Sequence, residues 1–146
     1  MTRLTPFKAN GKLFQPLIEL GGKMAALGIA APISHLIDIR ASQLNGCAYC
    51  LAMHLKEARD DGESQVRLDL IATWRETDLF DERERAALAW TEIVTDLDRS
   101  RPNDAEYDAL VAAFGDADAV AVTVRIAMIN MWNRINVPFH VPPLLK

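Results

Sequence analysis

Cysteine is scarce in this chain, with only Cys47 and Cys50 among 146 residues. Two cysteines cannot make the disulfide framework of a small secreted scaffold. A chain of this length can bury about 70% of its unfolded surface without such a framework. Cys47 and Cys50 are therefore available for chemistry, and their close spacing favours a redox or metal-binding role.

Positive charge is also in short supply, since 16 Lys and Arg face 20 Asp and Glu, giving a net charge of −4. This balance argues against a nucleic acid or an anionic membrane as partner. The most apolar stretch, 117–132, is interrupted by Thr123, Arg125 and Asn130 and is shorter than the roughly 20 residues of a membrane span. No signal-peptide pattern follows Met1, so we expect a cytoplasmic protein.

Strict strand alternation is lacking, whereas apolar residues recur at helical spacing throughout. We therefore predict an all-α protein, a single-domain helical bundle of about seven helices. The domain is expected to span 1–146, with a core of about 17–136 and an extended, proline-containing tail over 137–146. The expected helices cover approximately 13–27, 32–44, 48–62, 64–74, 81–96, 103–114 and 116–134.

The most informative motif is C-x2-C-x3-H, formed by Cys47, Cys50 and His54 directly after a turn at Gly46. Both cysteines fall in the first turn of a predicted helix, where free N–H groups stabilise a thiolate. Helical spacing places Cys47 beside Cys50 and Cys50 beside His54. The geometry therefore permits both a disulfide and a thiolate–imidazole pair.

The motif predicts Cys50 as the nucleophile and Cys47 as the resolving thiol. Cys47 gains more from the helix dipole, an effect of about 0.3–1 kcal/mol. Cys50 gains His54 as charge partner and general base, and a contact pair is worth roughly 4 kcal/mol before desolvation. Even half of that value exceeds the dipole effect.

Other interpretations of these residues stay open at this point. Free cysteines are often simply small core residues. A zinc site would need Cys47, Cys50 and His54 with a fourth ligand from His35 or His140. Attachment of c-type haem is excluded because Leu51, not histidine, follows Cys50. His35 is either a hydrogen-bonded core histidine or a second base that relays protons to His54.

The string Ile39–His54, IRASQLNGCAYCLAMH, resembles the core of the alkylhydroperoxidase D (AhpD) branch of the carboxymuconolactone decarboxylase family. The resemblance continues through 56–59, 74–77, 82–92 and 130–134 and covers most of the chain, from about Leu17 to Asn136. It implies an all-α fold assembled as a homo-oligomer, a trimer or hexamer. It also implies thiol-dependent peroxidase or disulfide reductase activity that requires no metal or haem.

The resemblance assigns catalytic roles to three motif residues and raises a question about a fourth. It implies that Cys50 attacks peroxide, that Cys47 resolves the product and that His54 takes part in a proton relay. The family relay includes a glutamate twelve residues before the first cysteine, and His35 occupies that position here. A neutral imidazole can pass a proton but lacks the negative charge that would stabilise a His54 imidazolium.

Three functions compete at this stage. The leading hypothesis is an antioxidant oxidoreductase that acts on hydroperoxides or disulfides and is regenerated by a thiol reductant or a redox partner protein. The second is a non-redox enzyme of the same family that acts on a small lactone or keto acid, with His35 and His54 as acid and base. The third is a non-enzymatic redox switch.

The sequence also predicts self-association. The helix expected over 116–134 is apolar on nearly all sides, including Val120, Val124, Ala127, Met128 and Met131. Such a helix needs partners on all sides. We therefore expect it to lie at the centre of the fold or at an interface between subunits.

Overall fold

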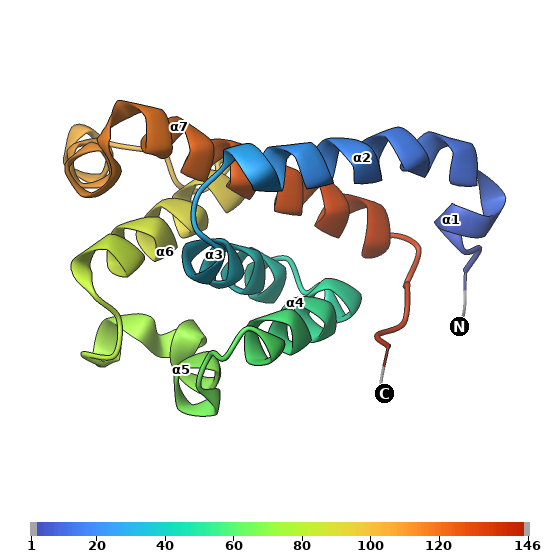
Figure 1. Ribbon diagram of the computed structural model, residues 1–146, viewed down its shortest axis with the longest axis horizontal. Helices are drawn as coiled ribbons and strands as arrows, with labels where there is room; N and C mark the ends of the chain where they lie inside the picture. The colour runs from blue at the N-terminus through green and yellow to red at the C-terminus, as the bar shows by residue number, and fades with distance from the viewer. Residues whose placement is uncertain (1–2, 145–146) are drawn as a thin grey trace.

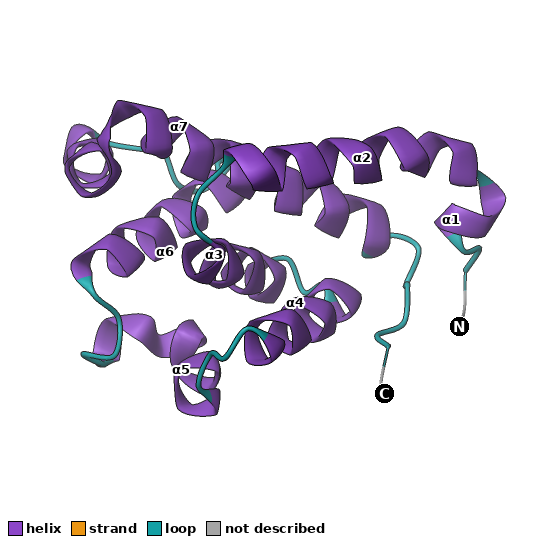
Figure 2. Cartoon of the chain, in the orientation of Figure 1, coloured by secondary structure: helices purple, strands orange, loops and turns teal. Residues whose placement is uncertain are grey.

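Helices make up all the regular secondary structure of residues 3–144, which the computed structural model describes (Figures 1 and 2). The elements within this range are α1 (Pro6–Ala9), α2 (Gly11–Leu27), α3 (Ala31–Leu44), α4 (Ala48–Asp60), α5 (Gln65–Leu70), the 3₁₀ helix η1 (Ile71–Glu76), α6 (Glu82–Thr95) and α7 (Asp104–Asn136). The predicted all-α bundle is confirmed.

Most helix starts fall where the sequence signals place them. Asp81 and Asn103 each form a reciprocal capping box at the start of α6 and α7, and the Ser64 side chain caps α5. The helices expected over 103–114 and 116–134 are joined in α7, but Gly115 interrupts the helix with a φ of 73°. Glycine adopts this left-handed conformation without the cost of a side-chain clash.

The centre of the fold is α3, which packs against α4, α6 and α7. Leu36, Ile37 and Ile39 of this helix are completely buried. The helix expected over 116–134 forms the second part of α7. It is buried along one side, where Val122 and Ile126 lie. Its other side reaches the surface, because Val120 is 64% exposed.

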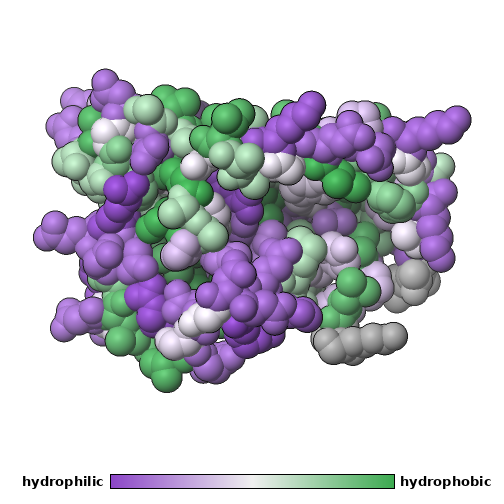
Figure 3. All heavy atoms as spheres, in the orientation of Figure 1, coloured by the Kyte–Doolittle hydropathy of each residue, from purple (hydrophilic) through white to green (hydrophobic). Residues whose placement is uncertain are grey.

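Much of α2 is exposed at the surface, although it is rich in apolar residues. Phe14 is its one buried residue and stacks on Trp132 of α7 with 6.2 Å between the ring centres. Large apolar side chains of α2 lie exposed, namely Leu13, Ile18, Leu20 and Leu27. Figure 1 shows α2 running along α7, and Figure 3 shows apolar side chains at the surface over these two helices.

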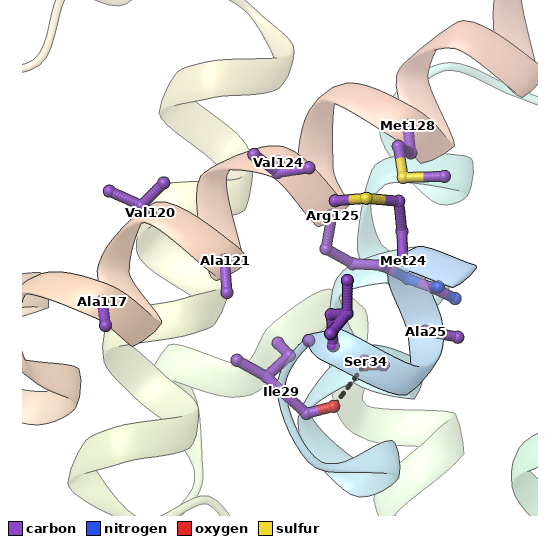
Figure 4. A pocket seen from close by; sticks show the side chains of 12 residues that line it. Met24, Ala25, Ile29, Ser34, Ala117, Val120, Ala121, Val124, Arg125 and Met128 are labelled. Atoms are coloured by element: carbon purple, nitrogen blue, oxygen red, sulfur yellow. Dashed lines mark hydrogen bonds between the residues drawn. The ribbon is translucent and has the colours of Figure 1, made fainter. Parts of the chain in front are cut away.

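A shallow apolar groove separates the C-terminal end of α2 from the middle of α7 (Figure 4). Its volume is about 210 Å³, and its walls include Met24, Ile29, Val124 and Met128. Arg125 also contributes to this lining. We call this surface, together with the exposed residues Leu27 and Val120 that also line it, the α2–α7 groove.

After α7 the chain turns back on itself. Val137–His140 form a turn in which His140 takes a φ of 52°, and the Val141 N–H donates to the carbonyl of Asn136. Residues 141–144 form neither helix nor strand. The segment expected as a tail over 137–146 thus begins with this turn, and 145–146 lie outside the described residues. No helix between residues 3 and 144 is long and apolar enough to cross a membrane.

Candidate active site around Cys47 and Cys50

The two cysteines lie at the junction between α3 and α4. Gly46 makes the turn with a φ of 65°, and Cys47 is the N-terminal capping residue of α4. The Asn45 side chain secures this turn to α7 by donating to the Oδ1 atoms of Asn130 and Asn133, at 2.9 and 2.8 Å. The position of the cysteines therefore depends on α7 as well as on the local sequence.

Further hydrogen bonds orient both α7 asparagines. Asn133 Nδ2 donates to Ser42 Oγ on α3, and Asn130 Nδ2 donates to Thr95 Oγ1 on α6. All four of these side chains are buried. Leaving one such buried amide without its partner costs about 1–3 kcal/mol, so each hydrogen bond helps to fix the relative positions of these helices.

Cys47 and Cys50 are joined by a disulfide whose Cα atoms are 5.4 Å apart. Both cysteines are buried, at 2% and 1% exposure. Each sulfur accepts a different hydrogen bond. The Cys50 backbone N–H donates to Cys47 Sγ at 3.3 Å, and the Asn136 side-chain amide donates to Cys50 Sγ at 3.4 Å. Both donors would also stabilise the corresponding thiolates after reduction.

His54 lies one helical turn after Cys50 and is also buried. Its Nδ1 is 2.8 Å from Glu57 Oε2 and 3.6 Å from Asp38 Oδ2. The hydrogen bond to His54 is the largest influence on Glu57 and holds the pKa of this carboxyl below its usual 4.5, against the opposing effect of burial. Two carboxylates thus converge on one ring nitrogen of His54.

Asp38 is almost completely buried on α3 and is paired with Arg125 of α7. Arg125 Nε donates to Asp38 Oδ1 at 2.9 Å, and its Nη2 contacts Oδ2. Burial alone would lower the pKa of Arg125, but the hydrogen bond to Asp38 and the charge of that carboxylate raise it overall. Asp38 therefore places a carboxylate next to His54, and Arg125 holds its guanidinium against that carboxylate.

His35 takes a place at one side of this cluster. Its Nε2 lies 2.7 Å from Asp61 Oδ2, just after the end of α4. The nearby His35 is also one of the smaller electrostatic influences that lower the pKa of Glu57. The structure therefore brings together Cys47, Cys50 and His54, and it places His35 beside Asp61.

A cavity of about 620 Å³ opens beside this cluster. Chemically active side chains contribute to one wall, namely Asp38, Cys50, His54, Arg125 and Asn136. The remaining lining is largely apolar and includes Phe14, Ile18, Met53, Met128 and Trp132. Such a cavity, mostly apolar with a few convergent polar groups, is the usual form of a small-molecule site. We call it the main cavity.

A separate cleft of about 260 Å³ adjoins Cys47. Gly46, Cys47 and Ala48 form one side, and the segment that follows α7, including His140 and Pro143, forms the other. Asn136, Val141 and Pro142 line both this cleft and the main cavity. We call this second space the Cys47 cleft. Within residues 3–144, no group of three His, Cys, Asp or Glu side chains is arranged to hold a metal ion.

Sequence reasoning missed several residues of the site, among them Asp38, Glu57, Arg125 and Asn136. A signal existed for Asp38, because it interrupts the apolar run Leu36–Ile39, where an acid is buried only with a partner. Arg125 interrupts an apolar stretch in the same way. Asn136 carries no such signal, since only the fold brings the end of α7 to Cys50.

Comparisons with known proteins agree with this architecture. A solved structure of a protein of unknown function from Agrobacterium tumefaciens, suggested to be the antioxidant defence protein AhpD, is 38% identical over the full length of both chains, with a TM-score of 0.95. YdfG of Bacillus subtilis, which is uncharacterised, is 37% identical over 70% of this chain and 69% of its own. The debrominase Bmp8 shares the fold alone, at 20% identity and a TM-score of 0.81 over 95% of this chain and 75% of its own.

Residues 12–92 match the carboxymuconolactone decarboxylase family, a range that runs from α2 through most of α6 and includes the C-x2-C-x3-H motif. The match, the TM-score of 0.95 and the Cys47–Cys50 pair lead to one conclusion. The chain belongs to the carboxymuconolactone decarboxylase family, in its AhpD-like branch.

Proposed function

We propose that the protein is a thiol-dependent peroxidase or disulfide reductase that cycles Cys47 and Cys50 between dithiol and disulfide. The observation that carries this proposal is the Cys47–Cys50 disulfide at the wall of a cavity that also contains His54. A buried disulfide with no chemical role would need neither an adjacent cavity nor a histidine supported by two carboxylates. The cytoplasm would suit this cycle, because its thiol pools reduce disulfides.

The oxidative half of the cycle starts at Cys50. His54 accepts the Cys50 proton, and the thiolate attacks the distal oxygen of a hydroperoxide. The O–O bond breaks, the sulfur becomes a sulfenic acid, and the leaving alkoxide takes a proton from the His54 imidazolium. The Cys47 sulfur then attacks the Cys50 sulfur, the S–O bond breaks, and the Cys47 thiol proton passes to the departing hydroxide, so that water leaves and the disulfide forms. A dithiol reductant returns two electrons and two protons.

Three observations support Cys50 as the nucleophile and His54 as the base. Cys50 lines the main cavity together with His54, and the Asn136 amide donates to its sulfur. Asp38 supplies the negative charge that His35, at the position of the family glutamate, lacks. Because an imidazolium next to a carboxylate is stabilised, Asp38 compensates for that substitution.

A thiol titration tests the proposal directly. We expect one equivalent of an organic hydroperoxide to consume both thiols of the reduced protein and a dithiol to restore them. The Cys47→Ser variant should form a sulfenic acid rapidly but not turn over, whereas Cys50→Ser should lose both reactions. If both thiols remain unoxidised after the hydroperoxide is added, the proposed peroxidase function is refuted. Unchanged sulfenic acid formation in Cys50→Ser would make Cys47 the nucleophile.

We also propose that the chain forms a homo-oligomer, a trimer or hexamer, through the α2–α7 groove. The support is the exposure of Leu27 of α2 and Val120 of α7, which both line this groove, at 81% and 64%. Apolar patches of this kind mark interaction surfaces. Light scattering at micromolar concentration should give a multiple of 16.2 kDa, and Val120→Glu should lower it. A wild-type protein that is strictly monomeric would refute this proposal.

A further inference from the structure

The last residue of α7, Asn136, contacts the sulfur of Cys50, which lies 86 residues earlier in the chain. Its side-chain amide donates to Cys50 Sγ, with Nδ2 and Sγ 3.4 Å apart. Sulfur in a disulfide or a thiolate can only accept a hydrogen bond, so the nitrogen side of the amide faces it. Asn136 and Cys50 both line the main cavity, where a substrate would meet them.

Asn136 is held in this position by contacts on both sides along the chain. Asn133, three residues earlier and on the same face of α7, is completely buried and accepts a hydrogen bond from Asn45 at 2.8 Å. After the helix, the Val141 N–H donates to the Asn136 carbonyl at 3.2 Å. The amide is therefore in place before a substrate arrives, and such preorganised donors are the ones that accelerate reactions most.

We infer that Asn136 is a catalytic residue whose two amide hydrogens have separate roles: one holds the Cys50 thiolate, and the other donates to the hydroperoxide oxygen that this thiolate attacks. The inference rests on the proposed peroxidase cycle and adds a residue to it. An asparagine amide carries two N–H donors on one nitrogen. One of them is given to Cys50 Sγ, and no protein acceptor within residues 3–144 takes the other.

The oxidation step uses both donors at the same time. The Cys50 sulfur attacks the distal oxygen, an S–O bond forms, and the O–O bond breaks with its electron pair going to the oxygen that carries the organic group. That oxygen takes a proton from the His54 imidazolium and leaves in the alcohol. The distal oxygen keeps its own proton and stays on Cys50 as the sulfenic acid. An N–H donor beside the sulfur can hold the distal oxygen throughout and keep the two reacting atoms aligned.

The charged groups around the reacting sulfur have other tasks. His54 on α4 exchanges the proton, and its Nδ1 is 2.8 Å from Glu57 Oε2. Arg125 of α7 is paired with Asp38 of α3. The Asn136 amide is uncharged and does not titrate, so it donates at every pH. Because these four charged groups stay in place when Asn136 is replaced, a change in the thiol reports the lost amide.

Two reactions of the same thiol separate the two roles of the amide. In a Cys47→Ser parent protein, Cys50 is the one remaining thiol, and the pH dependence of its alkylation by iodoacetamide gives the midpoint of thiolate formation. Oxidation by tert-butyl hydroperoxide, measured by stopped flow over the same pH range, involves the peroxide oxygen as well. Above the midpoint the thiol is ionised, so the ratio of the oxidation rate to the alkylation rate no longer depends on thiolate formation.

Two variants of Asn136 remove both donors and differ in shape and charge. Asn136→Leu should shift the alkylation midpoint to higher pH, and above that midpoint it should slow oxidation about tenfold without slowing alkylation. Asn136→Asp keeps the shape of the side chain and should lower the same ratio, with a still higher midpoint because a carboxylate then faces the thiolate. Gln65→Leu removes an exposed amide on α5, outside the main cavity, and as control should match the parent protein.

Either of two results overturns the inference while the peroxidase function stands. If Asn136→Leu has the alkylation midpoint of the parent protein, the amide does not stabilise the thiolate. If both variants keep the parent ratio of oxidation to alkylation, the amide does not contact the peroxide oxygen. Failure of the proposed function gives a different result, in which the parent protein with Asn136 intact is alkylated but not oxidised. That result refutes the peroxidase cycle and, with it, the catalytic role of Asn136.

Discussion

Helices α3 and α2 differ in almost every physical respect although both are largely apolar. Half of the 14 residues of α3 are buried, and they include Asp38, which contacts His54. Only Phe14 is buried among the 17 residues of α2. Helix α3 provides the charged framework of the site, and α2 provides an apolar wall of the main cavity. We infer that the chemistry depends on α3 and α4, and the choice of substrate on α2.

The largest expected effect concerns Cys50 on α4, the helix on which, together with α3, we expect the chemistry to depend. Cys50→Ser should abolish hydroperoxide-dependent turnover, because it removes the thiolate that attacks the peroxide. Ile18→Trp on α2 should instead change KM more than kcat, since it alters the cavity wall and not the reacting atoms. Steady-state kinetics with a bulky and a small hydroperoxide checks both. A similar loss of kcat in both variants would contradict the division between the helices.

A matched leucine pair measures how differently the two helices are packed. Leu36→Ala on α3 removes a completely buried side chain and should lower the free energy of unfolding by about 2–5 kcal/mol. Leu20→Ala on α2, where the side chain is 47% exposed, should change it by no more than about 0.5 kcal/mol. Urea unfolding gives both values. A large loss for Leu20→Ala would show that a partner subunit covers α2.

Asp38→Asn tests whether α3 carries the charge that the site needs. It leaves Arg125 beside a neutral amide, and we expect a loss of about 3 kcal/mol of stability, as for other buried pairs that lose one member. Oxidation by peroxide should slow because His54 loses a carboxylate partner. In a double-mutant cycle, the double variant Asp38→Asn with Arg125→Met should lose less stability than the sum of the single variants. Strict additivity would show that the pair is not coupled.

The smallest effect concerns the half-exposed Glu57 on α4. Its pKa is lowered in the folded protein, so its contribution to stability is present above about pH 4.5 and is lost as the pH falls through the folded pKa. Glu57→Gln should therefore weaken the dependence of stability on pH below about pH 4.5. Thermal unfolding between about pH 3 and 6 measures this, with Glu76→Gln, an exposed glutamate on η1, as control. If the stability of wild type and of Glu57→Gln depends equally on pH, the Glu57 carboxyl does not have a lowered pKa in the folded protein.

The sequence predicts the helices well because their start and stop signals are local. Asp81, Asn103 and Gly115 act through neighbouring backbone groups and could be recognised within a few residues. The placement of Cys47 at the start of α4, with Cys50 and His54 within this helix, follows from spacing in the same way. The roles of these residues stay predictions, to be tested by the experiments above.

The rest of the site depends on contacts that are distant in the sequence. Asp38 and Arg125 are 87 residues apart, and Asn136 and Cys50 are 86 apart. No local pattern predicts these pairs. In the sequence, His35 occupies the position of the family glutamate, which suggests that the site lacks a carboxylate. Asp38, three residues further along the same helix, supplies one. Residues three apart lie on the same face of a helix, so an inspection of the whole α3 face would have suggested it.

The asparagine clamp on the turn before Cys47 has a consequence for the order of events during synthesis. Asn45 is held by Asn130 and Asn133, so both cysteines leave the ribosome long before the helix that positions them. At about 5–20 residues per second, the gap of 85 residues to Asn130 lasts roughly 4–17 seconds. During that interval the thiols lack the Asn136 amide and the Asp38–Arg125 pair. The hydrogen bonds that hold the cysteine pair in place are thus complete only once α7 has docked, and under the proposed function the redox cycle could start only then.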